Sequence, residues 1–200
     1  MRAFYSVPLT LLALAIALPV SASVPSPNNS TIPPCLQMCP YGDLTYMVVI
    51  RDFANNPIPG SAVMLDFSGC PSVRLCPPPG PTTYYAFTNA QGVATFAVKG
   101  GGGCTRSVNV YADGVLLTYG SGQPNPSVAS PDQDGNKFVI VSDQAVLSAK
   151  TATDPTADLN CDGTHNAADD AVLSAHLGHY CDAVVPGAPH SWGQLKMQYR

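Results

Sequence analysis

The stretch from Asp158 to Asp169 (loop two) is the feature that most constrains what this chain can fold into. Oxygen-bearing side chains stand at its first, third, fifth, ninth and twelfth positions, and Gly163 stands at the sixth. Ca2+ is a hard ion that takes about six to eight oxygen ligands, and alternate residues of a tightly turning loop point inward. The sixth position needs a turn that glycine adopts without Cβ strain. This spacing therefore predicts a calcium-binding loop.

A copy of the same unit lies earlier in the chain, from Asp132 to Asp143 (loop one), with Lys137 at the sixth position instead of glycine. Each loop runs into a short helical pattern, Asp143–Lys150 after loop one and Asp169–His176 after loop two. An internal repeat that reproduces both the ligands and the helix is hard to obtain by chance. We therefore expect two loop-and-helix units, each with its own ion.

The candidate ligands are carboxylate and amide oxygens, with a backbone carbonyl at the seventh position and a water-mediated contact at the ninth position of loop two. They are Asp132, Asp134, Asn136, Phe138, Asp143, Asp158, Asn160, Asp162, Thr164, Asn166 and Asp169. The alternative is a pair of solvated Asp-rich turns without metal. It is less favoured because unpaired carboxylates this close would repel one another.

These two repeats, each closed by aspartate at the twelfth position, resemble a type I dockerin, which is a variant of the EF-hand calcium module. The resemblance implies a small helical module that folds on binding two Ca2+ ions and, in many members, docks onto a cohesin partner. The tenth and eleventh positions depart from the docking pattern: they are Val141-Ser142 and Ala167-Ala168, without the expected hydroxyl or charged pairs. The resemblance thus favours calcium binding over a cohesin partner.

The N-terminal residues 1–22 predict a secretory signal peptide. Arg2 gives a basic start, an apolar run spans Val7–Val20, and small residues precede a cleavage point after Ala22. A retained membrane anchor is the less favoured alternative, because the run is short for a bilayer. We therefore expect a protein that is secreted to the extracellular space or cell surface, with no membrane span in the mature chain.

The chain has seven cysteines, which are expected to pair in an exported protein and leave one free or bridged to another molecule. Cys161 and Cys181 bracket the second helix, and we expect a disulfide between them. A zinc site of His176, His179 and Cys181 is a less favoured alternative. The sequence leaves open the pairing of Cys35, Cys39, Cys70, Cys76 and Cys104.

Residues 42–128 predict an antiparallel β-sandwich, because short β-branched and aromatic segments alternate with turn sequences such as Asp113-Gly114. The expected strands span residues 44–51, 62–67, 83–88, 92–98, 107–112 and 114–119. The segments around Asn56-Pro57-Ile58-Pro59-Gly60 and Thr88–Phe96 resemble bacterial Ig-like domains of the invasin type and the carboxypeptidase regulatory-like sandwich. That resemblance implies a stalk, spacer or adhesion scaffold without chemistry of its own.

The remaining segments flank these two units. Residues 23–41 read as a Pro-rich linker, with possible glycan acceptors at Asn28 and Asn29. Residues 129–182 form the calcium module, which we expect to pack against the sandwich because two short helices bury little surface. The tail, 183–200, alternates like a β-strand that completes this protein's own sheet or adds to a neighbouring subunit.

The expected fold is therefore mainly β, an Ig-like sandwich followed by a small α-helical calcium module. All acidic residues are aspartate and most of them lie in that module, while no basic cluster suggests nucleic acid. No nucleophile elbow, metalloprotease helix or phosphate-binding loop indicates an enzyme. The hypothesis is a secreted, non-enzymatic calcium-binding structural or adhesion protein. The alternatives are a self-assembling filament subunit and a docking module for a cohesin partner.

Overall fold

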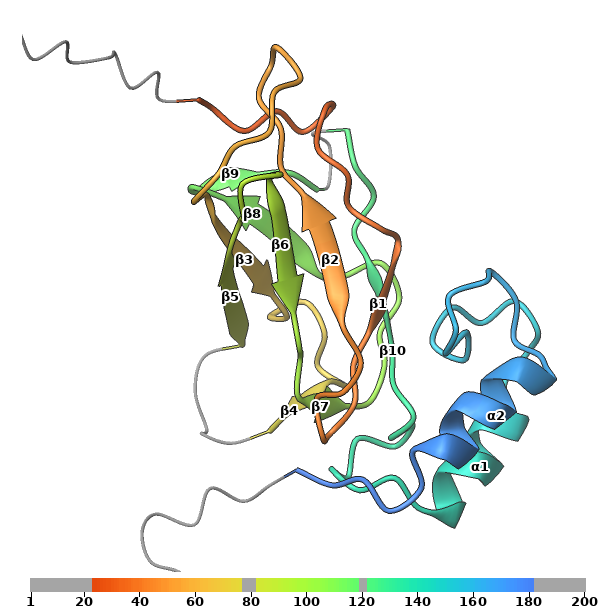
Figure 1. Ribbon diagram of the computed structural model, residues 1–200. Coiled ribbons are helices and arrows are strands. Elements are labelled where there is room, and N and C mark those ends of the chain that lie inside the picture. The colour runs from red at the N-terminus through yellow and green to blue at the C-terminus, as the bar shows by residue number, and fades with distance from the viewer. Residues whose placement is uncertain (1–22, 77–81, 119–121, 182–200) are drawn as a thin grey trace, which may run out of the picture.

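A computed structural model describes residues 23–76, 82–118 and 122–181, and it shows a mainly β chain with two short helices near its C-terminal end (Figure 1). The expected signal peptide, residues 1–22, and the tail, residues 183–200, lie outside the described residues. Within the described part of the chain, neither helix is long and apolar enough to cross a bilayer.

The six strand segments expected from the sequence each contain an observed strand. The strands are β1 (Cys35–Gln37), β2 (Tyr46–Val49), β3 (Ala62–Asp66), β4 (Arg74–Leu75), β5 (Thr83–Phe87), β6 (Val93–Phe96), β7 (Gly100–Gly101), β8 (Asn109–Ala112), β9 (Val115–Leu116) and β10 (Ser127–Ala129). The helices are α1 (Val141–Ser148) and α2 (Ala167–Ala175). The unexpected strands are β1, β4, β7 and β10, all of them only two or three residues long.

Two antiparallel sheets enclose the main hydrophobic core. One sheet has the order β5-β3-β8-β9, and β2 pairs with β6 in the other. Val63 and Leu65 on β3 and Val48 on β2 are fully buried in this core, because alternate residues of a strand point to the same face. The apolar alternation that predicted these strands is thus the pattern that fills the core.

The N-terminal segment differs from the expected linker, because it is part of this β body. Strand β1 pairs in parallel with β10, and isolated bridges join Pro25 to Asp52 and Thr31 to Val49. Ile32 is buried in the main core. Proline is compatible with extended backbone at a sheet edge, so a composition typical of a linker also suits a strand that borders the sandwich.

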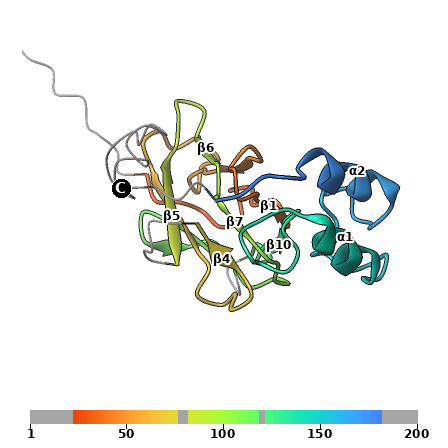
Figure 2. The same cartoon turned by 90° about the horizontal axis from the view of Figure 1, so that it is seen from below.

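The C-terminal loops and helices have a small core of their own, which residues from the β body complete. Leu147 on α1 and Leu173 on α2 are buried there together with Leu159, and Cys39 and Ala129 come from the β body. Figure 2 shows both helices beside that body. The expected packing of the two units is therefore confirmed. Helices of eight and nine residues depend on such tertiary contacts.

Three disulfides are present, and two of them tie the C-terminal unit to the β body. The bonds are Cys35–Cys161, Cys70–Cys104 and Cys76–Cys181. The expected bridge between Cys161 and Cys181 is wrong, although both cysteines are bonded. The nine residues of α2 extend over roughly 13 Å between these two cysteines, whereas disulfide Cα atoms are about 4.4–6.8 Å apart.

Non-reducing digestion should recover the three cross-linked peptide pairs and no peptide that joins Cys161 to Cys181. Cys39 is the free cysteine and is buried, so it should resist alkylation in the folded protein. Full denaturation without reductant should expose one thiol per chain. Mass spectrometry of the alkylated digest measures both results, and a native adduct on Cys39 would contradict the buried position.

Candidate metal centre

The first position of each loop organises the turn that follows it. In loop one, the Asp132 carboxylate accepts hydrogen bonds from the backbone N–H groups of Asn136 and Lys137, at 3.1 and 2.8 Å. In loop two, Asp158 accepts from the same fifth and sixth positions, both at 2.9 Å. The two loops therefore share their first turn despite different residues at the sixth position.

The twelfth position closes each loop onto its helix. The Asp143 carboxylate accepts hydrogen bonds from the N–H groups of Gln133, Asp134 and Ile140, the second, third and ninth positions. Asp169 accepts from the same three positions of loop two. Both carboxylates are fully buried. Each also lies in the first turn of the following helix, where a side chain that bonds the N-cap backbone stabilises the helix start.

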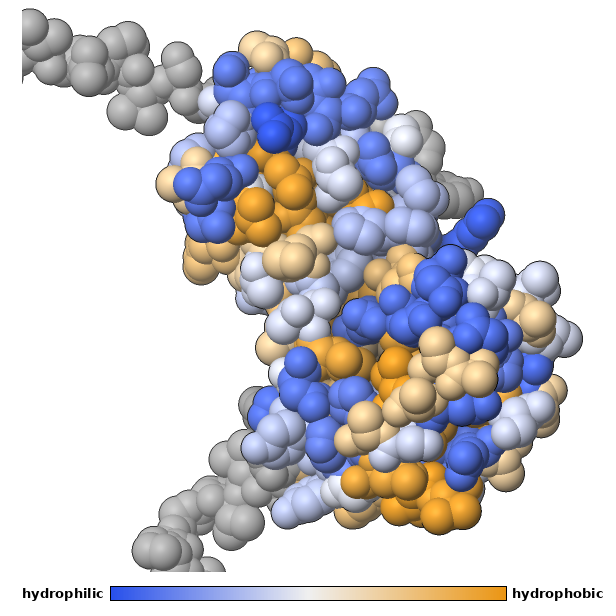
Figure 3. All heavy atoms as spheres, turned by 45° about the vertical axis from the view of Figure 1, so that its right-hand side comes forward, coloured by the Kyte–Doolittle hydropathy of each residue, from blue (hydrophilic) through white to orange (hydrophobic). Residues whose placement is uncertain are grey.

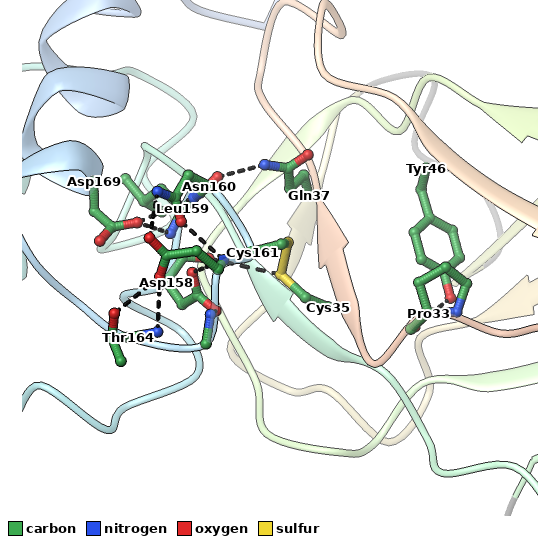
Figure 4. Close-up of a disulfide and its surroundings, with 12 residues drawn as sticks. Pro33, Cys35, Gln37, Tyr46, Asp158, Leu159, Asn160, Cys161, Thr164 and Asp169 are labelled. Carbon is green, nitrogen blue, oxygen red and sulfur yellow. Dashed lines mark hydrogen bonds between the residues drawn. A yellow bond between two sulfur atoms is a disulfide. The ribbon is translucent and has the colours of Figure 1, made fainter.

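Figure 4 shows Asp158, Asn160 and Asp169 of loop two beside the disulfide that joins the loop to β1. Cys161 stands at the fourth position with a left-handed backbone, φ 61°. Next to it, the Gln37 amide of β1 donates a hydrogen bond to the Leu159 carbonyl. Loop two is thus held to the β body by a covalent bond at its fourth position and a hydrogen bond at its second position.

Loop one brings three carboxylates around one point. Oxygen atoms of Asp132, Asp134 and Asp143 all lie within 4.8 Å of one another. Burial, with the neighbouring charges of Asp143 and Asp134 as further causes, raises the pKa of Asp132 to about 7. Like charges at this distance are unfavourable in a partly buried setting unless a cation accompanies them. The cluster therefore has the chemistry of a site for a hard cation.

Three further candidate ligands, Asn136, Asp162 and Asn166, are exposed and bond to the backbone of their own loops. At the fifth position, the Asn136 and Asp162 side chains accept hydrogen bonds from the N–H groups of Phe138 and Thr164. Asn166 caps α2, since its side chain accepts from the Ala168 N–H at 2.8 Å. The structure thus keeps all the candidate side chains within their own loops, with Asn166 serving first as a helix cap.

The two repeats are joined at their eighth positions. In loop one, the Val139 N–H donates to the His179 carbonyl, and the Val139 carbonyl accepts from the Gly178 N–H, both at 2.8 Å. In loop two, the His165 N–H donates to the Ala152 carbonyl at 2.8 Å. Each loop therefore pairs with the chain that follows the other repeat's helix, and the duplication forms one unit.

A second group of potential ligands connects the β body to the end of α2. Cys39, Asp43, His176 and His179 each place one ligand atom within 4.8 Å of the others. The alternative zinc site that the sequence suggested used Cys181 as its sulfur ligand, but Cys181 is bonded to Cys76. Sequence reasoning missed Cys39 because it is 140 positions from His179. The one signal for it was the odd number of cysteines.

This second group is not arranged as a nucleophilic site. Cys39 is fully buried, and burial raises the pKa of its thiol to about 12. The Cys39 sulfur and the Asp43 carboxylate both face Nδ1 of His179, at 3.5 and 3.4 Å. In a nucleophile–base–acid relay, the carboxylate and the nucleophile face opposite ring nitrogens. The arrangement suits convergent metal ligands better than a catalytic relay.

Comparisons with models of known protein families, with curated proteins and with solved structures find no match for this chain. The likeness to dockerins and to Ig-like domains therefore rests on the residues of this sequence.

Replacing Lys137 with glycine should stabilise loop one. Lys137 and Gly163, both at the sixth position, have φ values of 75° and 96°, so lysine occupies a left-handed conformation that glycine adopts freely. Relief of roughly 1–2 kcal/mol of strain is partly offset by about 0.5–1 kcal/mol of extra glycine flexibility in the unfolded chain. We expect a net gain of up to about 1 kcal/mol in the free energy of unfolding, measured by urea titration.

Lys137→Ala is the matched control, because it removes the same side chain and keeps the backbone strain. It should leave the free energy of unfolding nearly unchanged. Equal stabilisation by alanine and glycine would show that the lysine side chain, and not its backbone conformation, is responsible.

Proposed function

We propose that this chain is a secreted, non-enzymatic structural or adhesion protein whose C-terminal loop pair binds two Ca2+ ions. The observation that carries the proposal is the shared hydrogen-bond scheme of the loops, in which the first and twelfth carboxylates are held by the same loop positions in both copies. A scheme repeated in two different sequences points to a common ligand.

The donor set fits calcium. Each loop offers three carboxylates and an asparagine amide from its first, third, fifth and twelfth positions, and neither loop offers sulfur at those positions. Hard oxygen donors of this kind favour Ca2+ over transition metals. The ligands would be Asp132, Asp134, Asn136 and Asp143 with the Phe138 carbonyl, and Asp158, Asn160, Asp162 and Asp169 with the Thr164 carbonyl. Asn166 would contribute through a water molecule.

Calcium would act here as a structural ion. Extracellular modules of this type bind Ca2+ with dissociation constants of about 0.1–1 mM. A ligand at a hundred times its dissociation constant stabilises the folded state by about 2.7 kcal/mol per site. Because the loops belong to the unit that two disulfides hold against the β body, the ions would fix the shape of that end of the protein. The disulfides are themselves compatible with an extracellular location.

The β body fits the role of an inert scaffold. Its two antiparallel sheets around one core are compatible with the Ig-like sandwich that the sequence resembles, and such sandwiches serve as stalks and adhesion modules. The Asn29 amide donates to the Asp52 carbonyl at 2.8 Å, whereas Asn28 is exposed. Of the two glycan acceptors, Asn28 is therefore the one whose side chain a sugar could reach.

A second candidate function, self-assembly or docking of a protein partner, is favoured by exposed apolar side chains at the start of α1. Phe138, Ile140 and Val141 are 52, 45 and 72 % exposed. Figure 3 shows apolar side chains gathered at the lower end of the lobe that contains the C-terminal loops and helices. Such residues are costly to leave in water without a partner. Val141 is at the tenth position of loop one, where the dockerin pattern has a hydroxyl or charged residue.

Calorimetric titration of calcium-stripped protein should find two Ca2+ ions per chain. Asp143→Asn and Asp169→Asn should each lose one ion, because the amide keeps the size of the closing side chain and removes its charge. Asp170→Asn is the matched control, since this neighbouring helix residue is not among the ligands; it should retain both ions.

The thermal midpoint provides an independent measure of the same proposal. Calcium at about 10 mM should raise the unfolding midpoint of the wild-type protein relative to protein in EGTA, by several degrees if each site contributes about 2 kcal/mol. Both single variants should keep part of the shift. An unchanged midpoint together with no bound ion would refute calcium binding.

Light scattering after size-exclusion chromatography tests the second candidate. With calcium present, self-assembly predicts a mass that rises with concentration, and Val141→Asp should lower it by placing a charge in the apolar contact. Ser148→Asp, on the same helix, is the charge-matched control. A monomer at all concentrations would exclude self-assembly and leave a different protein as the partner.

A further inference from the structure

We propose that Cys39, Asp43, His176 and His179 form a structural site for one transition-metal dication, with Zn2+ as the best-fitting ion. The site lies outside both calcium loops and does not depend on the calcium proposal. All seven cysteines are within the described residues, and Cys39 is the one outside the three disulfides.

The spacing of the four ligand atoms is that of a metal site. The Asp43 carboxylate is 3.4 Å from Nε2 of His176 and 3.4 Å from Nδ1 of His179, and the Cys39 sulfur is 3.5 Å from the same Nδ1. Zinc bonds of about 2.0–2.3 Å in a tetrahedron place neighbouring ligand atoms roughly 3.3–3.8 Å apart. The two carboxylate–imidazole separations are longer than the usual N–H···O range of about 2.7–3.2 Å and fall within the ligand–ligand range of a zinc site.

The His176 ring is oriented for metal binding. Its Nδ1 lies 2.6 Å from the Val172 carbonyl oxygen. A carbonyl can only accept a hydrogen bond, so Nδ1 carries a proton, and in the neutral ring the free nitrogen is Nε2, which is the atom next to Asp43. Metal-bound histidines commonly donate their other ring N–H to a backbone carbonyl in this way.

The other ligands are also held in place before any ion arrives. The His179 ring packs edge-on against His176 and next to Tyr41, with centroid distances of 5.1 and 5.2 Å. Cys39 and Asp43 come from a tight turn after β1, where the Gly42 N–H donates to the Cys39 carbonyl at 2.9 Å. The four ligands therefore come from two segments, the turn that follows β1 and the residues that follow α2.

Burial and donor type both indicate a structural ion. Cys39 is fully buried, while the side chains of His176, His179 and Asp43 are 13, 28 and 34 % exposed, which leaves a solvent path for entry from one side. One thiolate, one carboxylate and two imidazoles are a donor set that zinc accepts and calcium does not. Four protein ligands complete a tetrahedron without an open position for substrate, as in structural zinc sites.

A metal here would be a further cross-link between the β body and the C-terminal unit. It would lie between elements that Cys35–Cys161 and Cys76–Cys181 already connect. Calcium in the two loops would order the C-terminal unit itself, whereas the zinc ion would hold that unit against the β body.

The test is a zinc titration of disulfide-intact, zinc-free protein with about 10 mM Ca2+ present throughout, in competition with a chromophoric zinc chelator. We expect one Zn2+ per chain. Co2+ used as the spectroscopic probe should give the visible bands of tetrahedral cobalt and a near-ultraviolet sulfur-to-cobalt charge-transfer band. Failure of calcium binding would leave these readouts unchanged, so the two proposals are tested separately.

Cys39→Ser should abolish the charge-transfer band and weaken zinc binding by more than roughly 100-fold. Loss of a residue that only supports a ligand weakens metal binding by about 10–100-fold, and loss of a ligand should cost more. Because Cys39 is in a core, Asp43→Asn and His179→Gln are parallel variants at more exposed positions, and each should also weaken binding. His165→Gln, in loop two, is the matched control and should bind zinc as the wild type does. Absence of stoichiometric zinc, or equal affinity in the Asp43, His179 and His165 variants, would overturn the site.

Discussion

The buried carboxylate that closes each loop is the interaction on which the C-terminal unit depends. Asp143 and Asp169 are fully enclosed, and each accepts hydrogen bonds from the start of its loop and from the residue that begins its helix. A buried charge is tolerated only where hydrogen bonds or an opposite charge accompany it. Loop, helix start and candidate ligand cluster are therefore one element, and a change at the twelfth position would affect all three.

Local patterns in the sequence predicted the parts of this fold that are locally determined. The alternation of β2, β3 and β8 identifies strands because each buries one face, and the spacing from Asp158 to Asp169 identifies a loop because its turn is made by its own residues. The composition of the N-terminal segment predicts a linker, because the strand it forms depends on a parallel partner, β10, that lies far along the chain. Nothing within residues 23–41 indicates that partner.

The pairing of the cysteines and the group of Cys39, Asp43, His176 and His179 could not be predicted from the sequence, for the same reason. Cys161 and Cys181 are close in the sequence, but helix α2 holds them apart. Each forms a disulfide with a cysteine of the β body instead. Cys39 approaches His179 only after the C-terminal unit has packed on that body. Ligands on one loop can be found by counting residues, whereas ligands brought together by packing require the tertiary structure.

The Cys35–Cys161 bond also changes how this protein would respond to mechanical load. It joins two cysteines that are 126 positions apart in the sequence. A pull applied at residues 23 and 181 passes from the first segment through the two sulfur atoms into the last segment. The Cys76–Cys181 bond closes a second covalent route between the same two points, through residues 36–76. Residues 77–160 lie on neither of these two routes, so that part of the chain can stay folded while the routes carry the load.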